Sequence, residues 1–575
     1  MQSKWLLGGA AALILSVPAH AASDAPTGYT KCAQVGGACS MSGTHSVALG
    51  KSGSFVYANL SGNFTCSKSL FTGGSALADS AWCSIGPASS SASSAAQSSA
   101  AASSVAASST AASSVAASSK ASSTAASSVA ASSKAASSSA ASSTGNDGAC
   151  VSACTDYIRQ NVKAKPLTQA RIDSEAGSLK SAFTAYLSAS NSALAADKAA
   201  LKAERAGLSS VPSARGSDKT GPDTMPLSET ASYYAGSKAL SIAREIVSFQ
   251  IPSGGWAKNM VRTGVVRAKG QSWTGGGIDP NSSDPANWPY VGTIDNGATI
   301  TELRYLGKVQ AAQTGDRASI QASITKGLNY LLAAQTPNWG WPQVYPLNGD
   351  YHDAITLNDD AMLNVIKLLR EIGTSANSDF AFIDTPLRNK CATAASNGTS
   401  WLLANQVFVN GKRTVWGQQH DVLTGAPTPA RAYEMPSLTS QESAKVVSFL
   451  MSLPNPDATT REAVYAAADF FKASQINDKK WSSGVLSSVS GTNAWARYYD
   501  LSVYNPAAST VTARVRMLFG DFADRHGSAS TVYGLIFGST TSVSAERLTG
   551  YAQYNSTAQA MLTNFASWSS KNARP

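Results

Sequence analysis

The sequence predicts a mostly α-helical protein: an (α/α) toroid or helical barrel with short β segments, preceded by a small disulfide-bonded β module. Apolar residues recur at helical spacing through the C-terminal part of the chain. No short β repeat of the kind that builds a parallel β-helix is visible there. Near the N-terminus, four of the seven cysteines lie between Cys32 and Cys83, as in small domains that need disulfides for stability.

Residues 1–21 are predicted to form a secretory signal peptide. Lys4 supplies a positive start, Trp5–Val17 is an apolar run, and Ala19-His20-Ala21 has the small residues of a cleavage site. A buried N-terminal helix is the alternative, which the cleavage pattern disfavours. No later stretch approaches the ~18 uninterrupted apolar residues of a membrane-spanning helix. We therefore expect a soluble, secreted (extracellular) monomer with no membrane partner.

Residues 28–86 are predicted to form the small β module. Short segments with Val, Phe and Tyr alternate there with Gly, Ser and Asn, and the four cysteines predict two disulfides in an oxidising compartment. Metal binding is the alternative, but the module has no CxxC pair and no histidine cluster. Aromatic residues of the module could stack on sugars, which predicts carbohydrate binding, although for any single one of them a place in the core is the favoured interpretation. The candidates are Tyr57, Phe64, Phe71 and Trp82.

Residues 87–148 consist almost entirely of Ser and Ala and are predicted to be a disordered linker, because such repeats bury too little apolar surface to fold. They separate the module from a large domain at 150–575. Of the remaining cysteines, Cys150 and Cys154 could pair with each other, which leaves Cys391 as a buried free thiol.

The net charge of +10 suits a polyanionic partner, whether nucleic acid, anionic lipid or acidic polysaccharide. Charge alone does not choose among these three partners. The sequence has no cluster of Lys and Arg interleaved with aromatic residues, which argues against nucleic acid as the partner.

Helical periodicity dominates the large domain. Ile300, Leu303, Leu306 and Val309 share one helical face, and the same spacing recurs from residue 320 to 331 and from 362 to 369. Further helices are predicted around 440–453, 461–473 and 553–568. Consecutive amphipathic helices joined by Gly/Pro/Asn-rich loops predict helices packed on helices.

The candidate functional residues lie in polar loops between these helices. Asp295 and Asp359 each precede an amphipathic helix, where an acidic residue commonly serves as an N-cap. Together, on one rim of a toroid, they would also offer oxygen ligands to a hard cation such as calcium. Arg431 lies in a loop stiffened by Pro427 and Pro429. From the composition of this loop alone, Arg431 would be an ordinary surface arginine.

Five motifs, in order and at compatible spacing over residues 225–568, resemble the family 10 pectate lyases. They are Gly254-Gly255-Trp256-Ala257-Lys258-Asn259, Thr293-Ile294-Asp295-Asn296, Gly340-Trp341-Pro342-Gln343, Asn358-Asp359-x-Ala361-Met362 and Ala430-Arg431-Ala432-Tyr433-Glu434. The resemblance implies a toroid with a central groove, dependence on Ca²⁺, and β-elimination of polygalacturonate to 4,5-unsaturated products. The partner it implies is pectin, with plant cell-wall polysaccharide as the expected ligand of the N-terminal module.

The resemblance also implies roles for individual residues. Asp295 and Asp359 look like the calcium ligands, and Arg431 looks like the catalytic base. The implied substrate-binding residues are Lys258, Asn296, Arg497 and Arg525. The chain has Arg525-His526-Gly527 where the family usually has Arg-Asp-Gly.

Two other functions remain open at this stage. A polygalacturonate hydrolase would use a pair of carboxylates on either side of the glycosidic bond, one of them protonated. A non-catalytic pectin-binding protein would need no base. Arg431 in its motif favours the lyase over both.

Overall fold

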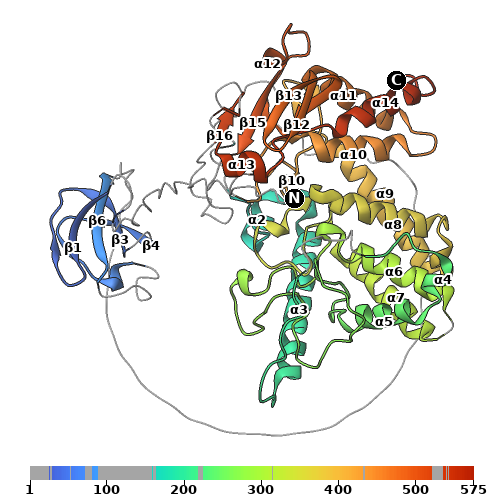
Figure 1. Ribbon diagram of the computed structural model, residues 1–575, viewed down its shortest axis with the longest axis horizontal. Helices are drawn as coiled ribbons and strands as arrows, with labels where there is room; N and C mark the ends of the chain where they lie inside the picture. The colour runs from blue at the N-terminus through green and yellow to red at the C-terminus, as the bar shows by residue number, and fades with distance from the viewer. Residues whose placement is uncertain are drawn as a thin grey trace, which may run out of the picture. The chain divides into compact units, whose positions relative to one another are not determined.

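The computed structural model divides the chain into two compact units, residues 1–130 and 131–575, which are described separately (Figure 1). The described residues are 25, 29–51, 54–71, 80–88, 158, 163–217, 225–313, 315–431, 434–520, 535–538, 540–541 and 543–575. The predicted signal peptide, nearly all of the predicted linker, Cys150, Cys154 and Arg525 lie outside them. Among the described residues, no helix combines the length and apolar character needed to cross a bilayer.

The small unit is an antiparallel β structure. Its four-stranded sheet has the order β1-β6-β3-β4, and a two-stranded sheet pairs β2 with β5. The strands are β1 (Thr30–Gln34), β2 (Ala38–Cys39), β3 (Thr44–Lys51), β4 (Ser54–Ser61), β5 (Phe64–Thr65) and β6 (Trp82–Ala88). Along β3 three consecutive residues, Val47, Ala48 and Leu49, are fully buried.

Two disulfides close this unit, as the cysteine spacing predicts. Cys32 pairs with Cys39, and Cys66 pairs with Cys83. Of the candidate stacking residues, Phe71 is buried in the core and Phe64 packs against it. Trp82 stays partly exposed, with the Lys31 ammonium 4.9 Å from its ring centroid. The side chain of Tyr57 lies outside the described residues.

The large unit is built mainly from helices, which confirms the mostly α prediction (Figure 1). The long helices are α3 (Lys180–Arg205), α5 (Ser237–Ser248), α6 (Ile300–Ala312), α7 (Arg317–Ala334), α8 (Ala361–Gly373), α9 (Thr385–Ala404), α10 (Ser440–Met451), α11 (Ala458–Ser474) and α14 (Thr557–Ser569). The short helices are α2 (Gln169–Glu175), α4 (Ala231–Tyr234), α12 (Val511–Arg514) and α13 (Ala545–Gly550). Consecutive helices pack against each other, as in α6 with α7, α8 with α9, and α10 with α11. Cys391 lies in α9 as a fully buried free thiol.

A buried tryptophan repeats after every second helix of this array. In each case the indole N–H donates to a carbonyl in the last turns of the preceding helix. The pairs are Trp256 with Ile246 of α5 (2.7 Å), Trp341 with Leu331 of α7 (2.7 Å), Trp416 with Leu402 of α9 (2.7 Å) and Trp495 with Phe471 of α11 (2.8 Å). All four rings are fully buried. Each one fixes how the chain leaves its helix and enters the loop that follows.

Strands occupy the loops and the C-terminal part of the large unit. Short pairs join β7 (Ile355–Thr356) to β10 (Gln419–His420) and β8 (Phe408–Val409) to β9 (Lys412–Arg413). Two sheets have the orders β11-β14-β15-β16 and β12-β13-β17. Their strands are β11 (Leu438–Thr439), β12 (Ile476–Ser482), β13 (Val485–Ala496), β14 (Tyr498–Tyr504), β15 (Val515–Gly520), β16 (Leu535–Phe537) and β17 (Tyr554–Asn555). The β12–β13 hairpin turns at Ser483-Gly484, where both φ angles are positive.

Candidate active site

The loops that follow the four tryptophans lie side by side along one rim of the helical array. Backbone hydrogen bonds join each loop to the next: Ile294 N donates to Gln343 O (3.1 Å), Leu357 N to Gln418 O (2.9 Å), and Ser440 N to Arg497 O (3.0 Å). Polar residues that are far apart in sequence therefore gather at one place. This rim carries every predicted site residue that the structure describes.

Asp295 and Asp359 lie in two one-turn segments, η6 (Asp295–Gly297) and η8 (Asn358–Asp360), which contact each other. Neither carboxylate caps the helix that follows. The N-cap positions of α6 and α8 are Thr299 and Asp360, and neither makes a side-chain cap hydrogen bond. Left-handed backbone at Asp359 (φ 51°) and Asp360 (φ 59°) separates η8 from regular helix. The capping hypothesis therefore does not describe these two carboxylates.

A cavity of about 250 Å³ lies between the loops. Five of the predicted residues line it: Lys258, Asp295, Asn296, Asp359 and Arg431. Further lining residues that the sequence analysis did not assign are Asn259, Tyr290, Gln343, Tyr351, Asn358, Gln419 and Glu434. Arg497 is not among the lining residues, and its guanidinium lies beside Glu442 (3.6 Å) and over the Tyr551 ring (4.5 Å).

Asp295 is almost completely buried and only partly neutralised. Its Oδ2 forms an ion pair with the Lys258 ammonium, which also lies 3.5 Å from the centroid of the Tyr290 ring. Its Oδ1 is buried and has no hydrogen-bond partner among the described residues. A buried carboxylate oxygen without a donor is costly, so this atom is available to a cation that enters the cavity.

Asp359 lies in a strongly negative environment. Its carboxylate accepts a hydrogen bond from Asn358 Nδ2 (2.9 Å). Although the residue is exposed at the cavity, desolvation of its carboxylate by the surrounding protein, together with the charges of Asp295 and Glu442, raises its pKa to about 6, and Arg497 opposes the shift. Within the described part of the chain, no three His, Cys, Asp or Glu side chains come together as a metal-ligand cluster. Besides Glu434, Asp295 and Asp359 are the carboxylates of this cavity that could hold a metal, and other oxygens would have to complete its shell.

The guanidinium of Arg431 is held by Glu434 through two hydrogen bonds. Nε donates to Oε2 (2.8 Å) and Nη2 donates to Oε1 (2.5 Å). Glu434 is 2% exposed. Its burial would raise its pKa, but the hydrogen bonds and charge of Arg431, helped by Arg497, hold that pKa below its ordinary value. Glu434 is thus an anion that orients the guanidinium of Arg431.

A buried network of polar side chains also forms hydrogen bonds with Glu434. Its Oε1 accepts from Gln418 Nε2 (3.3 Å) and from the Tyr551 hydroxyl (3.4 Å). The Tyr498 hydroxyl bonds to Gln418 Oε1 and to the Tyr551 hydroxyl. Of these residues, Glu434 could be selected from the sequence, because it ends the Ala430–Glu434 motif three residues after Arg431. The other three residues come from separate segments and become visible only in the fold.

Comparison with known proteins identifies the family. A family model described as pectic acid lyase matches residues 250–562, more than half of the chain, and includes all four loops of the rim. The chain belongs to the pectic acid lyase family. This pectate lyase is similar to two solved structures, a family 10 polysaccharide lyase from Cellvibrio cellulosa and an aspartate-to-alanine mutant of it in complex with trigalacturonic acid.

Both solved structures are 29% identical to the lyase, with a TM-score of 0.46. The mutant match covers 60% of this chain and 98% of the other, and the second match covers 62% and 98%. No curated protein sequence matches the lyase.

Proposed function

We propose that the large unit cleaves α-1,4-linked polygalacturonate by calcium-assisted β-elimination and releases 4,5-unsaturated oligogalacturonides. The observation that carries this proposal is the meeting of two carboxylates, the buried Asp295 and the more exposed Asp359, with Arg431 in one cavity. Membership of the pectic acid lyase family supports the same substrate and reaction class.

The donor set of the cavity fits a calcium ion. Asp295 Oδ1 lacks a hydrogen-bond donor, and Asp359 is surrounded by other carboxylates. Calcium binds oxygen ligands of this kind, and waters or a substrate carboxylate can complete its shell. Bound there, the ion would supply positive charge that neutralises the uronate carboxylate and the charge developing next to it.

The chain's own residues remove the proton and bind the substrate. A galacturonate ring carries an acidic proton on C5, beside its carboxylate, and its glycosidic oxygen leaves from C4. In our proposal Arg431 removes the C5 proton, and Glu434 holds its guanidinium in position. Lys258, Asn296 and Arg497 bind and orient the substrate, with the same role proposed for Arg525.

Substitution of Arg431 tests the base directly. Arg431→Lys and Arg431→Ala should both lower kcat at least about 100-fold, while KM changes little because the other residues hold the substrate. If Arg431 only bound a carboxylate, the lysine variant would retain much of its kcat and KM would rise in both. That outcome would leave Lys258 or a calcium-bound hydroxide as the base.

We also propose that the small unit binds plant cell-wall polysaccharide outside the cell, tethered by the Ser/Ala linker. Its two disulfides suit an oxidising compartment. Trp82, partly exposed beside Lys31, offers an aromatic ring and a positive charge to an acidic sugar. The deletion described in the Discussion tests this role.

A further inference from the structure

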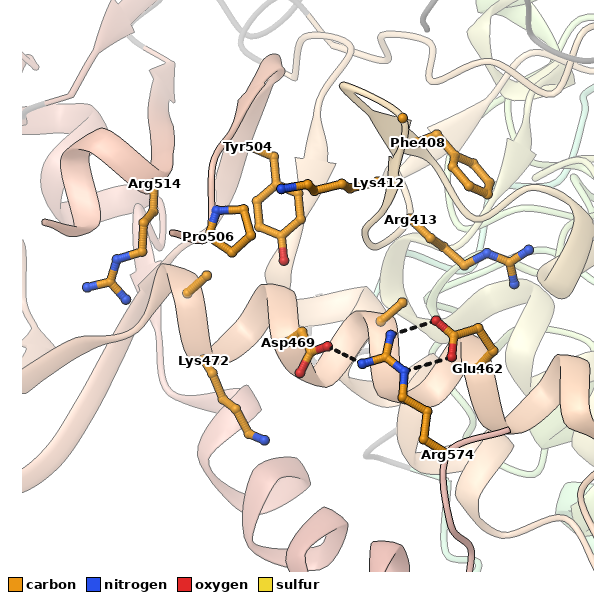
Figure 2. A pocket seen from close by; sticks show the side chains of 13 residues that line it. Phe408, Lys412, Arg413, Glu462, Asp469, Lys472, Tyr504, Pro506, Arg514 and Arg574 are labelled. Atoms are coloured by element: carbon orange, nitrogen blue, oxygen red, sulfur yellow. Dashed lines mark hydrogen bonds and ion pairs between the residues drawn. The ribbon is translucent and has the colours of Figure 1, made fainter. Parts of the chain in front are cut away.

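We propose that the large unit carries a second, non-catalytic site for carboxylated polysaccharide. The site is a cavity of about 730 Å³ between the β8–β9 hairpin, α11, the end of β14, α12 and Arg574 (Figure 2). It shares no lining residue with the active-site cavity. The inference takes its substrate class from the proposed function and assigns the polymer a second contact on the same unit.

Positive charge exceeds negative charge in this cavity. Five cationic side chains line it, Lys412, Arg413, Lys472, Arg514 and Arg574, against two carboxylates, Glu462 and Asp469. The difference of five minus two leaves a net charge of +3.

Arg574 already binds both of the carboxylates. It donates to Glu462 at 2.8 and 2.6 Å and to Asp469 at 2.8 Å, as Figure 2 shows. Both acidic residues are thus hydrogen-bonded to Arg574, and Glu462 acts on Arg413 only as a charge at longer range. Among the described residues, none of the other four cations forms an ion pair within 4.0 Å.

Two of the remaining cations have buried donors without acceptors. Arg413 Nη1 and Arg514 Nε are both buried, and neither has a hydrogen-bond partner among the described residues. A buried guanidinium nitrogen without an acceptor is costly. Figure 2 shows Arg413 and Arg514 on opposite sides of the cavity, with Lys412 reaching into the space between them.

Aromatic residues make the site suitable for a sugar acid rather than a simple anion. Phe408 is 37% exposed and has the Arg413 guanidinium 5.2 Å from its ring centroid. On the other side Lys412 extends across the cavity toward the ring of Tyr504 (Figure 2), which is itself buried, so Phe408 is the ring open to a sugar. A galacturonate residue presents a carboxylate and an apolar sugar face together, which matches cations placed beside aromatic rings.

Such a site would hold the polymer while a different segment of it occupies the active site. Two linked contacts strengthen binding of a long chain but leave a short one unaffected. The property that the site adds is therefore a preference for polymer over short oligomers, with no change in the chemical step.

The test compares the full-length enzyme with the double variant Lys412→Ala/Arg514→Ala. We expect KM for polygalacturonate to rise about fivefold, with kcat unchanged and both constants for trigalacturonate unchanged. In the presence of chelator, retention of the variant on insoluble pectate should fall by a similar factor. The matched control is Lys238→Ala/Lys480→Ala, which removes two exposed lysines that line neither cavity and should behave as wild type.

A second variant separates sugar recognition from charge. Phe408→Ala should weaken retention on pectate but leave binding to heparin, a sulfated polyanion, unchanged. Equal loss for heparin and pectate in the double variant, with no effect of Phe408→Ala, would show a general polyanion site and overturn the proposal.

Unchanged KM and retention in the double variant would also overturn it. Because retention is measured under chelator, this result is independent of whether the wild-type enzyme forms an unsaturated product.

Discussion

Replacing Glu434 by glutamine tests how the active site controls its arginine. Glutamine keeps the shape of the side chain, so the bonds from Gln418 and Tyr551 can largely remain, but the negative charge beside Arg431 is lost. The carboxylate favours the charged guanidinium, whereas a base must first lose its proton. Removing the carboxylate should therefore move the pH midpoint of kcat to lower pH.

The size of this change follows from the contact between the two groups. Opposite charges about 4 Å apart interact by about 4 kcal/mol near a protein surface, equivalent to about three pH units. The Arg431 side chain is 24% exposed, and solvent screening there reduces the effect, so we expect a change of about one to two pH units. Because the guanidinium is also less firmly oriented, kcat at its plateau should fall about 10- to 100-fold.

The assay is kcat on polygalacturonate at saturating substrate and calcium, measured at closely spaced pH values for both enzymes. Glu434→Asp is a useful control, because it keeps the charge and alters only the reach of the side chain. A midpoint that stays in place or rises in Glu434→Gln would show that Arg431 is not the titrating base.

Three further predictions concern the calcium ligands, the pH dependence of stability, and the small unit. Asp295→Ala and Asp359→Ala should lose activity but remain folded by circular dichroism, since neither side chain caps a helix; unfolding at room temperature would instead assign them a structural role. Burial raises the pKa of Asp353 to about 7. The contribution of its buried, protonated carboxyl group to stability is therefore complete below about pH 4 and is lost as the pH rises through 7. Up to about 4 kcal/mol of the free energy of unfolding should be lost in this way, and Asp353→Asn should flatten thermal unfolding midpoints between pH 5 and 8; an unchanged slope would contradict this. Deleting residues 22–148 should leave activity on soluble polygalacturonate intact and reduce retention on plant-wall material; equal retention would count against carbohydrate binding by the small unit.

Much of the helical framework could be predicted from local patterns. The predicted helices around 440–453, 461–473 and 553–568 correspond to α10 (Ser440–Met451), α11 (Ala458–Ser474) and α14 (Thr557–Ser569). Apolar spacing is enough for such elements, because each buries one face against its neighbours. The β12–β13 hairpin was not predicted, since its polar, Ser- and Lys-rich strands lack a strong apolar alternation.

Only part of the candidate site could be predicted from the sequence. Asp295, Asp359 and Arg431 could be selected from their motifs, and the structure brings all three to one cavity. Left-handed backbone at Asp359 and the buried support from Tyr498 could not be selected, because they depend on contacts between segments far apart in the chain. Local sequence identifies the reacting groups, whereas the tertiary fold determines their neighbours and charge.

The most direct test of the account follows the product of polygalacturonate cleavage by ultraviolet absorbance, with and without chelator. β-Elimination leaves a double bond conjugated with the carboxylate, so absorbance should rise together with new reducing ends. Chelation should stop both signals, and added calcium should restore them. New reducing ends without the absorbance would show hydrolysis by paired carboxylates, and full activity in chelator would remove calcium from the mechanism.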